Sequence, residues 1–423
     1  MLTRLLFPVI FTGATLLLSG CGQEEEKETS TLKMWVAPNI TQETFWGGVI
    51  RDWNAIPGNP KIEFTAIPVA GSSEEAIMNA LASGTEPDIS TNIFIGFATQ
   101  LAGQGLLTNF STLAGYDALV ATRKMEPFTK AWEINGENYV IPIYVSPIVY
   151  WWRGDLLKKL GIDHIPVTYE EVYSLSEKNV AAGGHYSMQV TAGKNWWDRW
   201  FDFVPLYYAA SGNKPYFNND RAEFNNPAGL EVLTFIQKMF LNKWSSYDFT
   251  SADDPLVTSD VIGAVRGPWD ITRYREQYPE ILNTIRIGPM LTATGRAAPA
   301  TMADSKGLVL FNSSDKKEEA WKFIQWVYSN PKYDVKWLEA TNMPPAREDL
   351  LTNPLFSAYL ENNPLAKEII SYVNRATPPA ATTRTIDVQR SMTQMIERTI
   401  FENASPAQAL QKSADEINHA QGK

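Results

Sequence analysis

The sequence predicts an α/β protein made of two doubly wound lobes that are joined by a multi-strand hinge. With 423 residues, the chain is too long for one ordinary core and suits two lobes of about 150 to 200 residues each. From residue 32 onward, strand and helix patterns alternate, which indicates a doubly wound lobe. Two apolar, β-rich runs, 139–145 and 148–152, then meet at Ser146-Pro147, as expected where a chain leaves one lobe and enters another.

The first lobe is predicted from hydrophobic periodicity. Strands are expected over 32–36 and 61–69, and helices over 41–55 and 73–83. Thr41 is the expected cap of the first helix, and Gly84 is the expected stop of the second. In a doubly wound lobe, ligands bind at the carboxyl ends of the strands.

Prolines interrupt the segment that joins the two lobes. Pro142 and Pro147 cannot donate ladder hydrogen bonds, so one uninterrupted strand is not expected there. A short amphipathic helix with a glycine stop follows over 155–161. Thr168 and Glu171 are spaced as a capping box at the start of another helix. A further, strongly periodic helix is expected over 226–243.

Composition excludes several classes of protein. The net charge of −10 argues against nucleic acid or an anionic membrane surface as a partner. None of the three histidines has a second His or Cys at ligand spacing, so we predict no metal site and no cofactor. Fourteen tryptophans favour a sugar-binding cleft, because the apolar faces of sugars lie on aromatic rings.

The N-terminus is predicted to direct export and anchoring. Residues 1–20 combine a positive charge with an apolar run that suits a secretory signal peptide. Residues 18–21, Leu-Ser-Gly-Cys, resemble the bacterial lipobox, which implies cleavage before Cys21 and its modification with acyl chains such as palmitate. Cys21 is the one cysteine, so no intramolecular disulfide is possible. Residues 21–31 form a charged, flexible tether, and lipid is the predicted membrane attachment.

Five motifs occur in one order along the chain. They are Gly-Thr-Glu-Pro-Asp-Ile at 84–89, Tyr-Val-Ile-Pro at 139–142, Trp-Arg-Gly-Asp-Leu-Leu-Lys-Lys-Leu-Gly-Ile at 152–162, Gly-Pro-Trp at 267–269 and Glu-Glu-Ala-Trp-Lys-Phe-Ile at 318–324. Together they resemble the extracellular solute-binding proteins of bacterial ABC importers. The likeness is to the carbohydrate-binding group, which includes the maltodextrin-binding proteins.

This resemblance implies a periplasmic-binding-protein-like fold of type II and a receptor rather than an enzyme. The receptor would be a lipid-anchored, extracytoplasmic monomer on the periplasmic side or the outer cell surface. It would bind a sugar or oligosaccharide between the lobes and deliver it to the permease subunits of an ABC importer. The expected lobes are 32–142 with 300–330, and 143–299 with 331–423.

The resemblance also implies a set of ligand-binding residues between the lobes. The expected aromatic groups are Trp35, Tyr144, Trp196, Trp197 and Trp269. The expected polar groups are Asn39, Ser72, Thr91, Asn92, Ser146, Asp270, Asp304 and Arg347. Among these residues, Trp269 is the strongest candidate, because the tryptophan of the Gly-Pro-Trp motif stacks on the sugar in that family.

Two other functions remain open from the sequence. The same clamp could hold a polyamine, which needs convergent carboxylates and aromatic rings, or a glycerol-phosphate-like solute, which needs arginine or lysine. An exported glycan-processing enzyme would need a carboxylate pair at ~5–9 Å, for which Glu170-Glu171 or Asp253-Asp254 could serve. Adjacent acids are more often solvated, and no serine-hydrolase or zinc-protease motif is present in the sequence.

Overall fold

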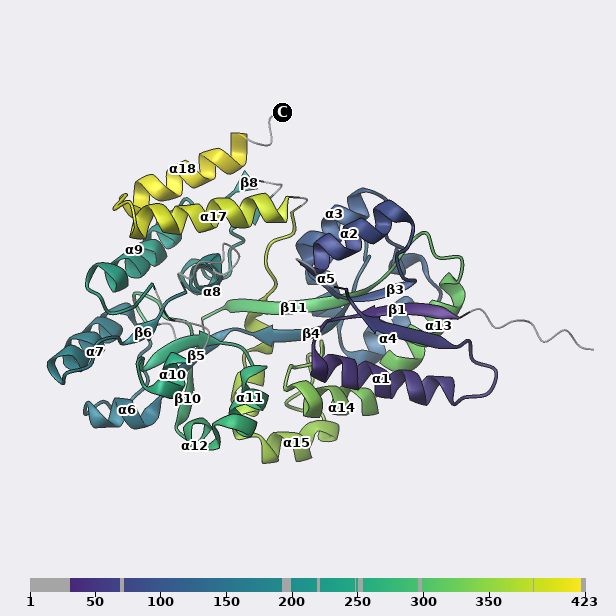
Figure 1. Ribbon diagram of the computed structural model, residues 1–423, viewed down its shortest axis with the longest axis horizontal. Helices are drawn as coiled ribbons and strands as arrows, with labels where there is room; N and C mark the ends of the chain where they lie inside the picture. Colours follow the sequence, from purple (N-terminus) through teal and green to yellow (C-terminus); the bar gives the residue numbers. More distant parts are fainter. Residues whose placement is uncertain are drawn as a thin grey trace, which may run out of the picture.

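The computed structural model describes residues 31–68, 72–191, 199–218, 221–247, 249, 254–295, 299–382 and 384–419. Figure 1 shows these residues as two lobes linked by strands that run between them. Each lobe has its own sheet with helices packed against it. The predicted α/β architecture of two lobes is confirmed.

In the first lobe, six strands of the described ranges form one sheet. β1 pairs in parallel with β2 and β3, whereas β11 runs antiparallel to β3 and β4. β12 pairs in parallel with the start of β11. The strands are β1 (Leu32–Val36), β2 (Ile62–Ala66), β3 (Ile89–Ile93), β4 (Ile141–Pro147), β11 (Thr301–Leu310) and β12 (Ala376–Thr377).

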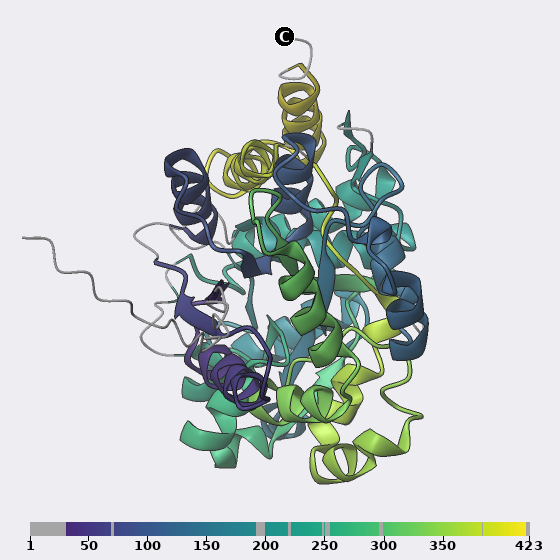
Figure 2. The same cartoon turned by 90° about the vertical axis from the view of Figure 1, so that its right-hand side faces the viewer.

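Helices cover both faces of this sheet. Leu32, Met34 and Val36 of β1 share a core with α1, α13 and α14, whereas the alternate residue Trp35 packs with α2 and α3. Figure 2 shows α1 (purple) and α2 (dark blue) on opposite sides of β1. The helices of this lobe are α1 (Ile40–Asn54), α2 (Ser73–Ser83), α3 (Ile95–Gly103), α4 (Tyr116–Arg123), α5 (Glu126–Ala131), α13 (Lys317–Tyr328) and α14 (Lys332–Thr341).

Caps set the ends of several helices. The side chain of Asn39 accepts two backbone hydrogen bonds at the start of α1, so the predicted cap Thr41 is wrong and the cap lies two residues earlier. Gly84 ends α2 with a φ of 66°, as predicted. Thr168 and Glu171 form the predicted capping box of α7.

The second lobe has a smaller sheet in the order β10-β5-β9-β6. Its strands are β5 (Val149–Arg153), β6 (Met188–Gln189), β9 (Gly263–Arg266) and β10 (Ile285–Gly288), and a hairpin is formed by β7 (Phe217–Asn218) and β8 (Arg221–Ala222). Its helices are α6 (Gly154–Lys159), α7 (Tyr169–Ala181), α8 (Arg199–Ser211), α9 (Pro227–Leu241), α10 (Pro255–Thr258), α11 (Asp270–Gln277), α12 (Pro279–Leu282), α17 (Thr385–Ile400) and α18 (Pro406–His419). No helix in the described ranges has both the length and the apolar composition needed to cross a membrane.

The hinge consists of chain segments that run from one lobe to the other. The sheet changes between Pro147, the end of β4, and Val149, the start of β5, as predicted, whereas β4 continues through Pro142 with a shift in its register against β11. β11 crosses back, with Met302 in the second-lobe core and Leu308 in the first-lobe core. After β12 the chain crosses again, since the carbonyl of Pro378 accepts a hydrogen bond from Tyr208 of α8 at 3.0 Å.

The segment after residue 330 does not all pack with the second lobe. α14 packs on α1 of the first lobe, whereas α16 (Pro364–Ile370), which follows α15 (Ser357–Asn362), contacts β10 of the second. α17 and α18 pack with α8 and α9 of the second lobe. From the sequence, all of 331–423 was expected in the second lobe. We propose instead that the last segment of the second lobe begins after β12, where the chain crosses between the lobes.

The two lobes also touch outside the hinge, where the first turn of α3 meets the first turn of α17. A Cβ atom at Gly96 would lie 1.9 Å from Oγ1 of Thr385. Replacing Gly96 with alanine is therefore expected to lower the free energy of unfolding by about 1–3 kcal/mol, because this contact cannot accept a methyl group without movement. Chemical denaturation of Gly96→Ala, of Thr385→Gly and of the double variant measures the coupling between the two positions. If Gly96→Ala lowers the free energy of unfolding equally in the wild-type and the Thr385→Gly backgrounds, the steric explanation is contradicted.

Candidate functional site

The carboxyl ends of the parallel strands β1, β2 and β3 lie at one edge of the first-lobe sheet. Asn39 follows β1 at this edge, and its Oδ1 accepts hydrogen bonds from the backbone N–H groups of Thr41 and Gln42 at 3.1 and 3.3 Å. Ser72 caps α2 through a hydrogen bond with the backbone N–H of Glu75. The side-chain oxygens of Asn39 and Ser72, two of the predicted ligand residues, are therefore used to cap helices.

Two further predicted residues, Thr91 and Asn92, come from β3. Thr91 is buried, and its Oγ1 accepts a hydrogen bond from the backbone N–H of Ala37 at 3.0 Å, which ties β3 to the end of β1. Asn92 has a φ of 62°, and its Nδ2 donates to Oγ of Ser73 at 3.0 Å. Trp35 is half-buried and packs with α2 and α3. Five predicted residues therefore lie at or beside this edge, namely Trp35, Asn39, Ser72, Thr91 and Asn92. The hydroxyl of Thr91 is already used in a hydrogen bond within the lobe.

Strands β4 and β11 bring a second group of predicted residues to the hinge. Ser146 pairs with Asp304 across the two strands, and Tyr144 pairs with Lys306. Ser146 is fully buried, whereas Asp304 and Lys306 keep 30% and 24% of their side chains exposed. Lys306 was not among the predicted residues. Its signal in the sequence is its spacing of two residues from Asp304, which places both side chains on one face of a strand.

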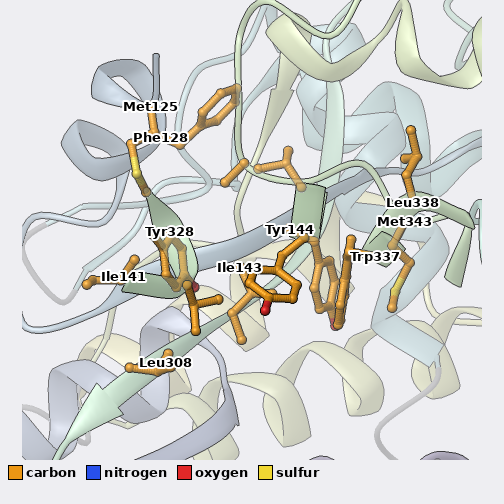
Figure 3. Packing of buried hydrophobic residues seen from close by; sticks show 14 of the residues in the cluster. Met125, Phe128, Ile141, Ile143, Tyr144, Leu308, Tyr328, Trp337, Leu338 and Met343 are labelled. Carbon is orange, nitrogen blue, oxygen red and sulfur yellow. The ribbon is translucent and has the colours of Figure 1, made fainter. Parts of the chain in front are cut away.

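Tyr144 is mainly a packing residue. Its ring stacks on Trp337 of α14, with centroids 5.6 Å apart and planes inclined by 21°, and Figure 3 shows the two rings side by side. Burial raises the pKa of the Tyr144 hydroxyl, and the nearby charge of Asp304 raises it further. The hydroxyl therefore stays protonated at neutral pH and is able to donate a hydrogen bond.

On the second lobe, Trp269 lies directly before α11 and after β9. It is half-buried and contacts the cores on both sides of the second-lobe sheet. A Cβ atom at Gly267 would lie 2.2 Å from its ring, so glycine at this position lets the indole approach the backbone closely. The Gly-Pro-Trp motif thus fixes an aromatic plane that keeps part of its surface exposed.

Charged residues beside Trp269 form a balanced network. Arg266 and Arg273 both contact the buried carboxylate of Asp254, at 3.1 and 2.5 Å, and both contact Asp270, at 3.5 and 3.1 Å. Burial raises the pKa of Asp270 against the opposing effect of the two arginines. Burial also raises the pKa of Asp254, but the two arginines and the Tyr274 hydroxyl outweigh this effect and hold the pKa below its usual range.

Arg347 is not placed where a ligand group is needed. It is buried in the first lobe, where its Nη1 donates to Asp334 at 2.9 Å and its Nε and Nη2 donate to the two oxygens of Asp349, each at 2.9 Å. Its guanidinium also lies 5.4 Å from the ring of Phe356. Because the guanidinium is buried and three of its five N–H donors are used inside the lobe, we remove it from the proposed ligand set.

Three predicted residues, Trp196, Trp197 and Cys21, lie outside the described residues. Within the ranges that the structure describes, no three His, Cys, Asp or Glu side chains gather as a metal site would require. The aromatic and polar groups that the structure does place lie at the edge of one lobe, on the hinge strands and at the start of α11. These groups therefore come from both lobes and from the hinge between them.

The chain belongs to the bacterial extracellular solute-binding proteins, a family whose model matches residues 37–333. This is a family of binding proteins, which confirms the prediction of a receptor rather than an enzyme. The chain is similar to the structure of an uncharacterized protein from Listeria monocytogenes, with a TM-score of 0.81, 30% identity and coverage of 92% of this chain and 99% of that one.

Two other similarities are more distant. The sugar-binding protein MalE from Xanthomonas citri aligns with a TM-score of 0.76 and 18% identity, covering 92% of this chain and 97% of that one, and this likeness shows the fold alone. The arabinooligosaccharide-binding protein of Halalkalibacterium halodurans is 19% identical over 233 residues, which are 52% of this chain and 50% of the relative. The chain spans about half the length of the curated relatives it matches.

Proposed function

We propose that this protein binds a sugar or oligosaccharide between its two lobes and delivers it to an ABC importer. The observation that carries the proposal is the position of Trp269, a partly exposed indole packed closely against Gly267 beside polar, hydrogen-bonding side chains. Such a ring suits the apolar face of a sugar. Membership of the solute-binding family supports the proposal, as do relatives whose names include sugar-binding and arabinooligosaccharide-binding proteins.

The proposed mechanism requires binding energy and no chemical step. A ligand that contacts both lobes favours the arrangement in which the lobes are close, and the shift equals its difference in affinity for the two states. The hinge suits this motion, because few residues between β4 and β5 need to change conformation. The importer would then recognise the ligand-bound arrangement.

The charges beside Trp269 favour a neutral ligand over the alternatives. Asp254 and Asp270 are matched by Arg266 and Arg273, so the network has no net charge. A polyamine would need carboxylates in excess, and a phosphorylated solute would need cations in excess. Neither excess is present in this network, so a neutral sugar is the ligand we propose.

A thermal-shift scan of the protein tests this proposal. The panel contains neutral mono-, di- and oligosaccharides, polyamines and phosphorylated polyols. A ligand at 100 times its dissociation constant adds about 2.7 kcal/mol to the free energy of unfolding, so the melting temperature should rise by several degrees. We expect the rise with one class of neutral sugar. A rise with polyamines or phosphorylated polyols alone would replace the sugar in the proposal.

The lipid anchor at Cys21 belongs to the same proposal, with residues 21–31 as the tether and 1–20 as the cleaved signal peptide. Its support is the lipobox-like sequence directly after the apolar run. Several acyl chains hold a protein at a membrane far better than one does. Mass spectrometry of the detergent-extracted protein should find Cys21 as the modified N-terminal residue. An unmodified Cys21 would remove the anchor and leave the proposed ligand unaffected.

A further inference from the structure

Two side chains bring charge to hinge strands that are otherwise buried. All seven residues of β4 are buried, and so are eight of the ten residues of β11. The exceptions are Asp304 and Lys306, which are two positions apart and therefore project from the same face of the strand. We call Asp304 and Lys306 the hinge pair.

The hinge pair lies beside an aromatic ring of the first lobe. Nζ of Lys306 is 3.2 Å from Oδ1 of Asp304 and 5.3 Å from the centre of the Phe94 ring. Phe94 directly follows β3, two residues after Asn92, and is half-buried. The pair therefore meets the edge where the parallel strands end, which is also the edge of the predicted residues Asn39, Ser72 and Asn92.

The hinge pair keeps hydrogen-bonding capacity after its own contact. An ammonium has three donors and a carboxylate has two accepting oxygens, and the contact between them uses one of each. Adjacent hydroxyls of a sugar are complementary to what remains, because one hydroxyl accepts from Lys306 while the next donates to Asp304. The Phe94 ring offers an apolar surface at the same place.

We propose that the hinge pair determines ligand class: Lys306 and Asp304 bind neighbouring hydroxyls of an uncharged sugar and select against its uronate and amino forms. This inference rests on the proposed function. Because the two charges lie 3.2 Å apart, a carboxylate on the sugar would be attracted by Lys306 and repelled by Asp304, and an ammonium would be attracted by Asp304 and repelled by Lys306. A charged sugar therefore gains little net attraction while it still loses hydration on binding, so the pair selects against both charged forms.

Isothermal titration with matched sugars tests the proposal. The probes are glucose, glucuronate and glucosamine, the corresponding galactose series, and the disaccharides of each. The wild-type chain is expected to prefer a neutral member. Lys306→Met should weaken binding of that neutral sugar by about tenfold or more, because a charge-assisted hydrogen bond is lost. Asp304→Asn should raise the ratio of uronate to neutral affinity, and Lys306→Met should raise the ratio of amine to neutral affinity.

The exposed Lys322 of α13 provides the matched control, since Lys322→Met makes the same substitution away from the hinge. It should leave all affinities unchanged, and the melting temperature of each variant separates binding loss from unfolding. Wild-type affinity ratios in both hinge variants would overturn the inference while leaving sugar binding intact. A wild-type preference for a uronate or an amine would also overturn it. No binding of any sugar by the wild-type chain would overturn the proposed function itself.

Discussion

Replacing Asp334 with asparagine is expected to lower the free energy of unfolding by about 3–5 kcal/mol, because it removes the shared partner of two buried cations. Asp334 is almost fully buried, and its two oxygens lie 2.6 Å from Arg123 and 2.9 Å from Arg347. Asparagine has nearly the same volume, so no cavity forms and the loss measures electrostatics. Arg347 retains Asp349, whereas Arg123 is left against the face of the Tyr328 ring, at 4.4 Å.

Urea denaturation followed by tryptophan fluorescence measures this loss as a lower midpoint with an unchanged slope. Asp387→Asn is the control, since Asp387 forms an exposed ion pair with Arg384 at 3.0 Å. Such pairs contribute little, so that variant should stay within about 0.5 kcal/mol of the wild type. Equal stabilities of Asp334→Asn and Asp387→Asn would show that the buried network contributes nothing.

Replacing Trp269 with alanine is expected to raise the dissociation constant for the bound sugar by at least about tenfold, which corresponds to 1.4 kcal/mol. The indole offers the ligand a flat apolar surface, and alanine removes it. Trp269→Phe keeps a smaller aromatic plane and should lose less affinity. Titration calorimetry with the sugar identified by the thermal-shift scan measures both constants.

Trp269 also packs against both cores, so its replacement is expected to reduce stability as well as binding. Trp326 of α13 provides the control, because it is another half-buried tryptophan and packs with Trp53 and Tyr333 in the first lobe. Trp326→Ala should lower the melting temperature without changing the dissociation constant. An unchanged dissociation constant in Trp269→Ala would remove this residue from the site.

The candidate site could be predicted from the sequence only in part. Trp269 stays a prediction, and its motif carries a local reason for its geometry, because Gly267 leaves room for the indole. Arg347 was misplaced because a buried guanidinium is indistinguishable from a ligand-binding one until its carboxylate partners are known. Lys306 was missed although it lies two residues from the predicted Asp304, because only the pairing of β11 with β4 shows that both side chains reach the surface at the hinge.

The sequence by itself determined the local elements, the interruption near Pro147 and the division into two α/β lobes. These features depend on residues within a few positions of one another, such as the capping box of Thr168 and Glu171 or the stop at Gly84. Only the tertiary structure decided which charges meet and which lobe each late segment joins. Asp334 reaches Arg123, and Gly96 meets Thr385, through packing between segments far apart in the chain. Such contacts depend on how complete elements fit together, and no pattern within one segment encodes them.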